Sequence, residues 1–310
     1  MTGHGNRETE MVPIIGLDNS DLSSATAAAP EQALGGEGSF ASTQPPKLVK
    51  LISKELDITD YSTILNWELE LFDSQPATIG GLDKEFIFAG RIDDKLCSWA
   101  AFMALLHSKT DDPSEGGIKL VALFDDEEIG SLLRQGARGN FLPITIERAV
   151  ESLCASSSSP RVAFGPGVLG QTYAGTFLVS SDVTHAAHPN FPQTNLADHS
   201  PRLNVGVALC VDASAHMTTD SVSMAILDRV AALAGCVNQR HMIRNDSRSG
   251  GTVGPMLSAA MGVKAADVGI PQLSMHSIRA TTGSLDPGLG IKFYKGFLDH
   301  WFEVDREWRK

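Results

Sequence analysis

A run of four consecutive carboxylates, Asp125 to Glu128, constrains this chain more than any other feature of its sequence. The run directly follows residues 118–124, an apolar stretch interrupted only by Lys119, which predicts a buried β-strand. Open α/β sheets bind ligands at the carboxyl ends of their strands. Four adjacent acids repel one another unless a cation or solvent offsets their charge, so a metal site is one interpretation. The other is an acidic turn into a helix, favoured by the helix dipole.

The composition is that of an ordinary globular protein and excludes two classes of function. The 310 residues are 42% hydrophobic and 20% charged, enough for one large domain or two smaller ones. The formal net charge of -12 argues against nucleic acid as a partner. No stretch of about 18 apolar residues is present, so we expect no membrane span. The beginning lacks a signal-peptide core and the four cysteines form no CxxC motif, so we expect a cytoplasmic protein with reduced thiols.

Three further strand-like stretches also end in potential metal ligands. These are Asp93 after residues 86–89, Asp182 after residues 176–180, and His276 after residues 268–275. A lone histidine is more often structural than a ligand, but four such positions at strand ends are harder to attribute to chance. Carboxylates and imidazole both bind zinc, and a spare carboxylate could act as a general base. Spacing alone does not divide these two roles between Glu127 and Glu128.

The remaining sequence predicts an α/β architecture with an irregular beginning. Residues 11–17 and 64–72 have the apolar or alternating character of strands, and residues 22–46 are rich in Ala, Ser, Gly and Pro, as in a flexible surface loop. Helices are predicted at 47–56, 96–106, 222–233, 256–261 and 287–301, and a further strand at 205–211.

Five segments together resemble peptidase family M18, the aspartyl aminopeptidases: EFIFAGRIDD, VALFDDEEIGS, SSDVTHAAHPN, RNDSRSGGTVGP and DVGIPQLSMHSIR. The resemblance extends from Asn6 to Phe302. It implies an α/β zinc-peptidase fold of the phosphorylase/hydrolase-like type, in which helices flank a mixed sheet. It also implies that residues 1–80, with the flexible loop 22–46, are the remnant of an inserted dimerisation domain. Residues 81–310 would then be the C-terminal part of the metallopeptidase catalytic domain.

The resemblance assigns roles to the residues at the strand ends. Asp93 would bridge two zinc ions, which is the number per subunit in the complete family site. Glu128 would be a zinc ligand, and Asp182 and His276 would be the other ligands, one for each ion. The implied cofactor is therefore a pair of Zn²⁺ ions, held mostly by carboxylates.

The same resemblance implies a function and an assembly. Glu127 would be the general base, and His185 would contact the peptide substrate. The protein would be a zinc-dependent aminopeptidase that releases N-terminal residues, with acidic residues preferred by default. Twelve subunits would form a homo-oligomer, located in the cytoplasm or, alternatively, in the vacuole.

Several positions depart from the family pattern. The family's remaining zinc ligand is a histidine in a His-Thr-Asp type motif, and none of the nine histidines here lies in such a context. Asp94 stands where the family usually has Asn, and Cys210 and Met217 stand where it commonly has a pocket Lys and Tyr. We therefore expect a weaker preference for acidic residues, unless another residue such as Arg279 supplies the positive charge.

These departures keep two alternatives open. One is a truncated or catalytically inactive M18-like paralogue that acts as an assembly or regulatory subunit, so we expect the 310 residues alone not to be a competent peptidase. Two tightly held zinc ions would require a substitute ligand among His4, His107, His188 and His199. The other is a magnesium-dependent phosphoryl-transfer enzyme using the acidic run and the glycine-rich loop 245–255. That loop lacks the P-loop lysine, and His276 is an unsuitable magnesium ligand.

Overall fold

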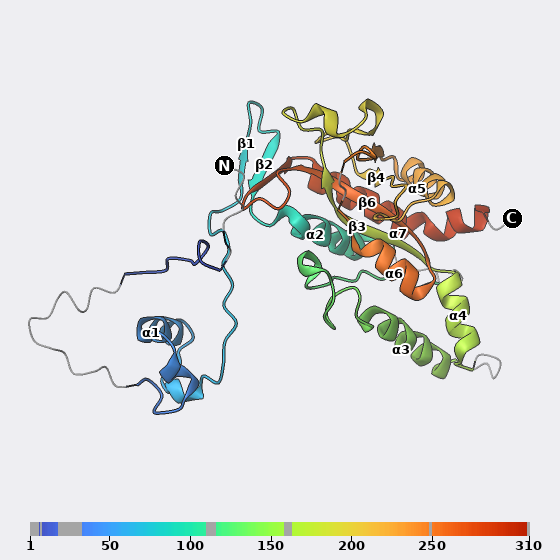
Figure 1. Cartoon of the computed structure of the whole chain (residues 1–310). Helices are drawn as coiled ribbons and strands as arrows, with labels where there is room; N and C mark the ends of the chain where they lie inside the picture. Colours follow the sequence, from blue (N-terminus) through green and yellow to red (C-terminus); the bar gives the residue numbers. More distant parts are fainter. Residues whose placement is uncertain are drawn as a thin grey trace, which may run out of the picture. The chain divides into compact units, whose positions relative to one another are not determined.

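The computed structural model describes residues 6, 8–17, 33–109, 116–157, 163–247 and 250–308. The chain divides into two compact units, residues 1–71 and residues 72–310 (Figure 1). The division falls after Leu71. The remnant of an inserted domain at residues 1–80, which the resemblance implies, stays a prediction. Residues 22–32 of the expected flexible loop lie outside the described residues.

The first unit is a small helical cluster. It contains α1 (Pro46–Glu55) and two short 3-10 helices, η1 (Phe40–Thr43) and η2 (Tyr61–Thr63). Its buried core consists of three side chains, Ala41, Val49 and Ile64. The described end of the expected flexible loop is therefore ordered into η1, because Ala41 contributes to this core.

Two strands predicted near the beginning of the chain are not formed. Residues 11–17 and 64–72 carry no strand in the described structure, and Ile14 and Leu65 are 91% and 83% exposed. A period of two predicts which face of a strand is apolar, but a strand also needs a neighbour that shares its hydrogen bonds. Within the described residues, neither stretch pairs with such a neighbour.

The second unit is built on a mixed sheet that has seven strands in its described part. They are β1 (Thr78–Gly80), β2 (Phe86–Ala89), β3 (Phe177–His185), β4 (Ala208–Cys210), β5 (Gln239–His241), β6 (Lys264–Leu273) and β7 (Ala280–Gly283). The order is β1-β2-β7-β6-β4-β5, and β3 also pairs with β6. The β3–β6 and β4–β5 pairs are parallel and the others are antiparallel. The predicted α/β class with a mixed sheet is confirmed.

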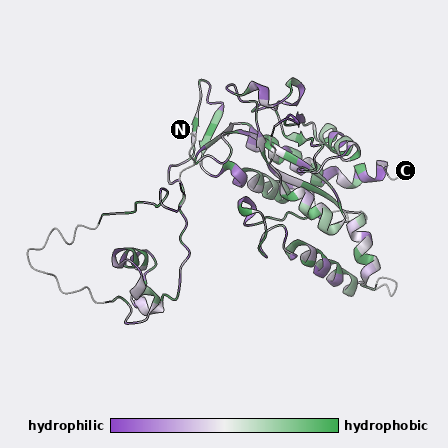
Figure 2. Ribbon diagram, in the orientation of Figure 1, coloured by the Kyte–Doolittle hydropathy of each residue, from purple (hydrophilic) through white to green (hydrophobic). Residues whose placement is uncertain are grey.

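Helices cover both faces of this sheet (Figure 1). On one side lie α2 (Ile92–His107), α5 (Ser221–Ala234) and α7 (Asp286–Trp308), and on the other lie α3 (Phe141–Ala155), α4 (Pro166–Ala174) and α6 (Val253–Met261). Successive residues of β3 face opposite sides, as the pleat requires, so Phe177 joins the first core and Leu178 the second. The helices carry both hydrophobic and hydrophilic residues along their lengths (Figure 2). The five helices predicted from sequence correspond to α1, α2, α5, α6 and α7.

The apolar stretch before the acidic run is not the buried strand that the sequence predicts. Residues 118–124 carry no strand, and Ile118 and Leu123 are 49% and 55% exposed. Ala122 and Phe124 do pack against the core under α6. The apolar run thus contributes side chains to this core, but no described strand pairs with it. Three short 3-10 helices complete the second unit: η3 (Glu127–Ile129), η4 (Pro192–Thr194) and η5 (Ala197–His199).

Candidate metal centre

The first pair of site residues, Asp93 and Asp94, lies where β2 turns into α2. Gly90 and Arg91 form the turn, and Arg91 adopts the left-handed conformation with φ 56°. Asp93 and Asp94 have non-helical dihedral angles, and the peptide bond between them is cis. The backbone N–H of Cys97 donates to Asp94 Oδ1 at 3.2 Å. Strand β2 thus brings two carboxylates to the N-terminal end of a helix, which favours negative charge.

The acidic run folds into a tight turn around η3. Asp126 has φ 60°, and the N–H of Ser131 donates to its backbone carbonyl at 2.8 Å. Ser131 is fully buried, and a Cβ at Gly136 would lie 2.6 Å from the Ser131 backbone carbon. This close backbone approach fixes the turn that presents Glu127 and Glu128.

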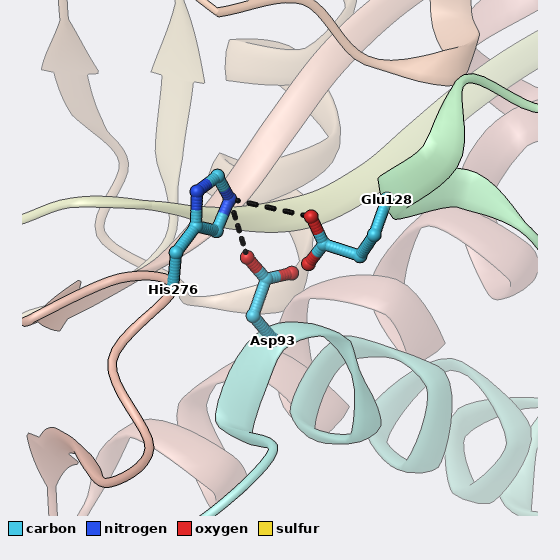
Figure 3. Close-up of side chains that lie close together, drawn as sticks. All are labelled: Asp93, Glu128 and His276. Atoms are coloured by element: carbon cyan, nitrogen blue, oxygen red, sulfur yellow. Dashed lines mark ion pairs between the residues drawn. The ribbon is translucent and has the colours of Figure 1, made fainter. Parts of the chain in front are cut away.

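His276 completes one group of metal-binding side chains. It follows β6 in a turn where both Ser274 and His276 have positive φ. Its Nε2 lies 3.5 Å from Asp93 Oδ2 and 3.5 Å from Glu128 Oε2 (Figure 3). One ligand atom from each of these three residues lies within 4.8 Å of the others. Three elements far apart in the sequence therefore converge on one point.

A second group shares Asp93 with the first. It consists of Asp93, Asp94 and Asp182, again with ligand atoms within 4.8 Å of one another. Asp182 lies in β3, and the N–H of Val183 donates to its Oδ1 at 2.6 Å. The sequence indicated Asp93 and Asp182 as ligands, but it did not indicate Asp94 as one. The signal was present in the acidic doublet, whose second member departs from the family's usual Asn.

The carboxyl groups of this centre are held partly away from water, which penalises their charged forms. Burial raises the pKa of Asp182 to about 9, with Asp94 and Asp93 adding repulsion. Burial also raises the pKa of Asp94 well above its usual range and raises that of Asp93, where Glu128 adds repulsion. Among the described residues, no Lys or Arg forms an ion pair with these carboxylates. Within this part of the chain no such side chain offsets their negative charge, and a divalent cation would do so.

The donor set fits zinc, which takes histidine nitrogen and carboxylate oxygen in proteins. The first group offers one imidazole and two carboxylates, the three protein ligands usual at a catalytic zinc. The second group is made of carboxylates alone. No other described histidine joins either group, so His107, His188 and His199 do not replace the missing ligand here, and His4 lies outside the described residues.

His185 lies beside the centre without belonging to either group. It ends β3, and its ring centroid is 6.4 Å from that of His241, which is buried. Partial burial lowers the pKa of His185, and His276 contributes in the same direction. A neutral imidazole at this position can donate or accept a hydrogen bond.

Arg279, named from the sequence as an alternative source of positive charge, has its guanidinium already engaged. Its Nη1 lies 2.5 Å from Asp73 Oδ2, and its Nη2 donates to the carbonyls of Pro76 and Phe88 at 3.0 Å. Cys210 is buried in β4, and burial raises the pKa of its thiol. The guanidinium of Arg279 is therefore already paired, and the thiol of Cys210 carries no positive charge, so neither side chain offers a free cation to an acidic substrate. Among the described helices, none combines the length and apolar character needed to cross a membrane.

Comparisons with known proteins show which family and fold this chain resembles. The family model described as aminopeptidase I zinc metalloprotease (M18) matches residues 2–298. Vacuolar aminopeptidase 1 of Saccharomyces cerevisiae is 40% identical over 97% of this chain and 57% of its own length. The structure of Chaetomium thermophilum mApe1 is 77% identical, with a TM-score of 0.85 over 99% of this chain and 63% of that chain. The S. cerevisiae mApe1 dodecamer is 41% identical, with a TM-score of 0.75 over 87% of this chain and 58% of that chain. This chain thus spans less than two thirds of each of these proteins.

Proposed function

This chain belongs to the M18 family of aminopeptidase I zinc metalloproteases, and we propose that it supplies much of a centre that removes single residues from peptide N-termini. The observation that carries the proposal is the convergence of Asp93, Glu128 and His276 from three separate elements (Figure 3). Together with the family match, this convergence favours a hydrolytic metal centre over the phosphoryl-transfer alternative. Magnesium prefers oxygen ligands, and His276 lies at the middle of the group.

The ligand roles follow from the two groups. We assign Asp93, Glu128 and His276 to one zinc ion, with Asp93 also facing a second ion on the side of Asp182. In the complete family site, two zinc ions would share Asp93. Zinc supplies Lewis-acid activation of water and of a carbonyl oxygen when it is bound.

Glu127 is the residue we propose as the general base. It lies beside Glu128 in η3 but belongs to neither group of candidate ligands. Burial raises its pKa, and Glu128 and Asp93 add repulsion. A carboxylate with a raised pKa accepts a proton more readily near neutral pH. Glu127 would take the proton of the attacking water and pass it to the leaving amine.

The substrate is proposed to be a peptide with a free N-terminus, and His185 would hydrogen-bond to it beside the metal centre. The family default is an acidic first residue. Cys210 and the engaged Arg279 both argue for a weaker acidic preference here, because neither offers a free positive charge.

The assembly and location are proposed from the relatives. A homo-oligomer of twelve subunits is supported by the S. cerevisiae mApe1 dodecamer. A cytoplasmic location, with the vacuole as the alternative, is consistent with a relative named vacuolar aminopeptidase 1.

A second candidate function is an assembly or regulatory subunit without peptidase activity. One observation favours it: among the described residues, the Asp182 side of the centre contains no histidine. On this view the chain binds one zinc ion and contributes to an oligomer, but it does not turn over peptides.

The test is to join this chain to the part of the Chaetomium thermophilum protein that it does not cover, and to measure release of N-terminal residues with zinc present. We expect turnover, and we expect Glu127→Gln to reduce it by about 10²–10⁴-fold, as loss of a general base does. Asp125→Asn is the matched control, because it removes an exposed acid from the same turn. A folded, zinc-loaded chimera without turnover would favour the regulatory subunit. Equal turnover in the Glu127→Gln variant would refute the role of the base.

A further inference from the structure

We propose that Arg279 is a positioning residue for the metal centre, because its guanidinium fastens residues 72–76 to the two turns that carry proposed metal ligands. Asp93 lies in the first of these turns, after β2, and His276 lies in the second, between β6 and β7. The inference rests on the proposed zinc centre and extends it to a residue that belongs to neither group of candidate ligands. All of these residues lie within the second unit.

The guanidinium of Arg279 binds four oxygen atoms from two separate segments. Its Nη1 lies 2.5 Å from Asp73 Oδ2 and donates to the Gln75 carbonyl at 3.2 Å. Its Nη2 donates to the carbonyls of Pro76 and Phe88, both at 3.0 Å. The side chains of Arg279 and Asp73 are only 23% and 11% exposed, so this network is largely shielded from water. One side chain from the β6–β7 connection thus ties the segment before β1 to strand β2.

The backbones of the same segments approach one another closely at Gly90, which follows β2. A Cβ added at Gly90 would lie 3.2 Å from the Ile278 carbonyl oxygen and 3.4 Å from Asp73 Cβ. The last paired residue of β2 also faces the first of β7 in the antiparallel ladder, so both ligand-bearing turns meet the sheet at the same place. A side chain that fixes this place therefore fixes one end of each turn.

A second, weaker contact joins residues 72–76 to the turn that carries Asp93. Arg91 Cζ lies 5.0 Å from the centroid of the Phe72 ring, a cation–π distance. Phe72 is 66% exposed, and such contacts contribute less where water reaches them. The largely shielded network of Arg279 therefore carries most of this attachment.

The ligands need such support because packing does little to hold His276. Its side chain is 66% exposed, and its backbone lies in a turn with φ 60°. Groups behind a metal ligand keep it in position, and loss of one weakens metal binding by about 10–100-fold. Arg279 suits this role because a guanidinium presents five N–H donors in one rigid plane, which the ammonium group of lysine does not reproduce.

The experiment measures the zinc affinity of the 310-residue chain by competition with a chromogenic chelator, alongside urea unfolding. We expect Arg279→Gln to weaken zinc binding by about 10–100-fold, as loss of a supporting group does. Arg279→Lys should weaken it as well, because charge alone does not bridge the four oxygen atoms. Asp73→Asn is a milder variant that should fold, since Asn keeps an oxygen for the Gln75 N–H, which donates to Asp73 Oδ1 at 3.1 Å. It should weaken zinc binding in the same direction.

Two further readouts separate positioning of the ligands from a general loss of stability. The visible absorption of Co²⁺ bound in place of zinc reports the geometry of its ligands, so the spectrum should change in Arg279→Gln. The variant that combines Arg279→Gln with Asp73→Asn should bind zinc no more weakly than Arg279→Gln alone, because both substitutions break the same network. A further loss in the combined variant would contradict a shared network.

Arg229→Gln is the matched control. Arg229 donates from Nε and Nη2 to the two carboxylate oxygens of Glu307 at 3.0 and 2.9 Å, so this variant also breaks an Arg–carboxylate pair, but one between α5 and α7. It should leave the zinc affinity and the Co²⁺ spectrum unchanged. Equal weakening by Arg279→Gln and Arg229→Gln, or unchanged zinc binding in Asp73→Asn, overturns the inference and leaves the zinc centre intact. Failure of the wild-type chain to bind zinc overturns the zinc centre, and the inference with it.

Discussion

Raising the pH between about 6.5 and 8 should destabilise the metal-free chain, because Asp182 holds its proton in the folded state. Burial raises the pKa of Asp182 to about 9 in the folded chain, whereas an unfolded aspartate ionises near pH 4. In this window the folded state therefore binds one more proton than the unfolded state. The free energy of unfolding falls as the pH rises, by about 1.36 kcal/mol per pH unit for one proton, or about 2 kcal/mol across the window.

Other shifted groups either act in the same direction or titrate outside this window. Burial raises the pKa of Asp93, Asp94 and Glu127, so the titration of each in the folded chain has the same sign as that of Asp182. Burial lowers the pKa of His241 to about 4, so its contribution is gained as the pH rises from about 4 to 6.5, below the window. Burial also raises the pKa of Asp267 and Asp286, which lie outside the metal centre, so the contribution of Asp182 is taken from the difference between the wild-type chain and Asp182→Asn.

The assay is urea unfolding followed by circular dichroism at several pH values, in the presence of a chelator. Asp182→Asn should reduce the slope, because an amide does not titrate. Saturating zinc should also reduce it, because the ion replaces the proton as the partner of the carboxylates. Stability that stays level or rises between about pH 6.5 and 8 in the chelated wild-type chain would refute the reasoning.

Three further predictions concern the base, the substrate and the packing of α7. Glu127→Gln should retain zinc, whereas Glu128→Gln should lose it. Equal zinc loss in the two variants, measured by metal analysis, would contradict this division of roles. Because Cys210 offers no charge-assisted hydrogen bond, the chimera should prefer Asp-amide over Leu-amide less strongly than its relatives do, by the equivalent of about 1.5–3 kcal/mol; a strong acidic preference in steady-state rates would reveal another cation. Gly288→Ala should stabilise α7 by up to about 1 kcal/mol, because open space surrounds that position, whereas Gly296→Ala should cost about 1–3 kcal/mol through contact with Ala234. Equal urea midpoints for these two variants would contradict the packing of α7 on α5.

The strand-end pattern located the candidate site well because it depends on local sequence. Asp93 and His276 follow the observed strands β2 and β6, whereas Asp182 lies within β3, which continues to His185 beyond the predicted end at residue 180. A sheet brings such positions together whatever the details of its loops. Their roles as metal ligands remain predictions.

The apolar pattern was less informative where a strand also needs a neighbouring strand to pair with. Residues 11–17, 64–72 and 118–124 have the composition of strands, yet none forms one in the described structure. Periodicity reports which face is apolar, and it carries no information about whether a neighbouring strand is present. The same limitation hid the engagement of Arg279, because its partner Asp73 lies 206 residues away in the sequence.

The gathering of Asp94 with Asp93 and Asp182 could not be predicted because it depends on backbone conformation. Adjacent residues of a regular helix point in different directions, so Asp93 and Asp94 would not be expected to share a site. Non-helical dihedral angles at both residues allow their carboxylates to gather with Asp182.

The most direct test of the central claim is zinc-edge X-ray absorption of the 310-residue chain carrying one equivalent of zinc. We expect one nitrogen neighbour at about 2.0–2.1 Å, with oxygen atoms making up the rest of the shell. His276→Ala should remove the nitrogen neighbour, because His276 is the histidine of the described group. Sulfur neighbours at about 2.3 Å, or a nitrogen neighbour that persists in the His276→Ala variant, would contradict the account.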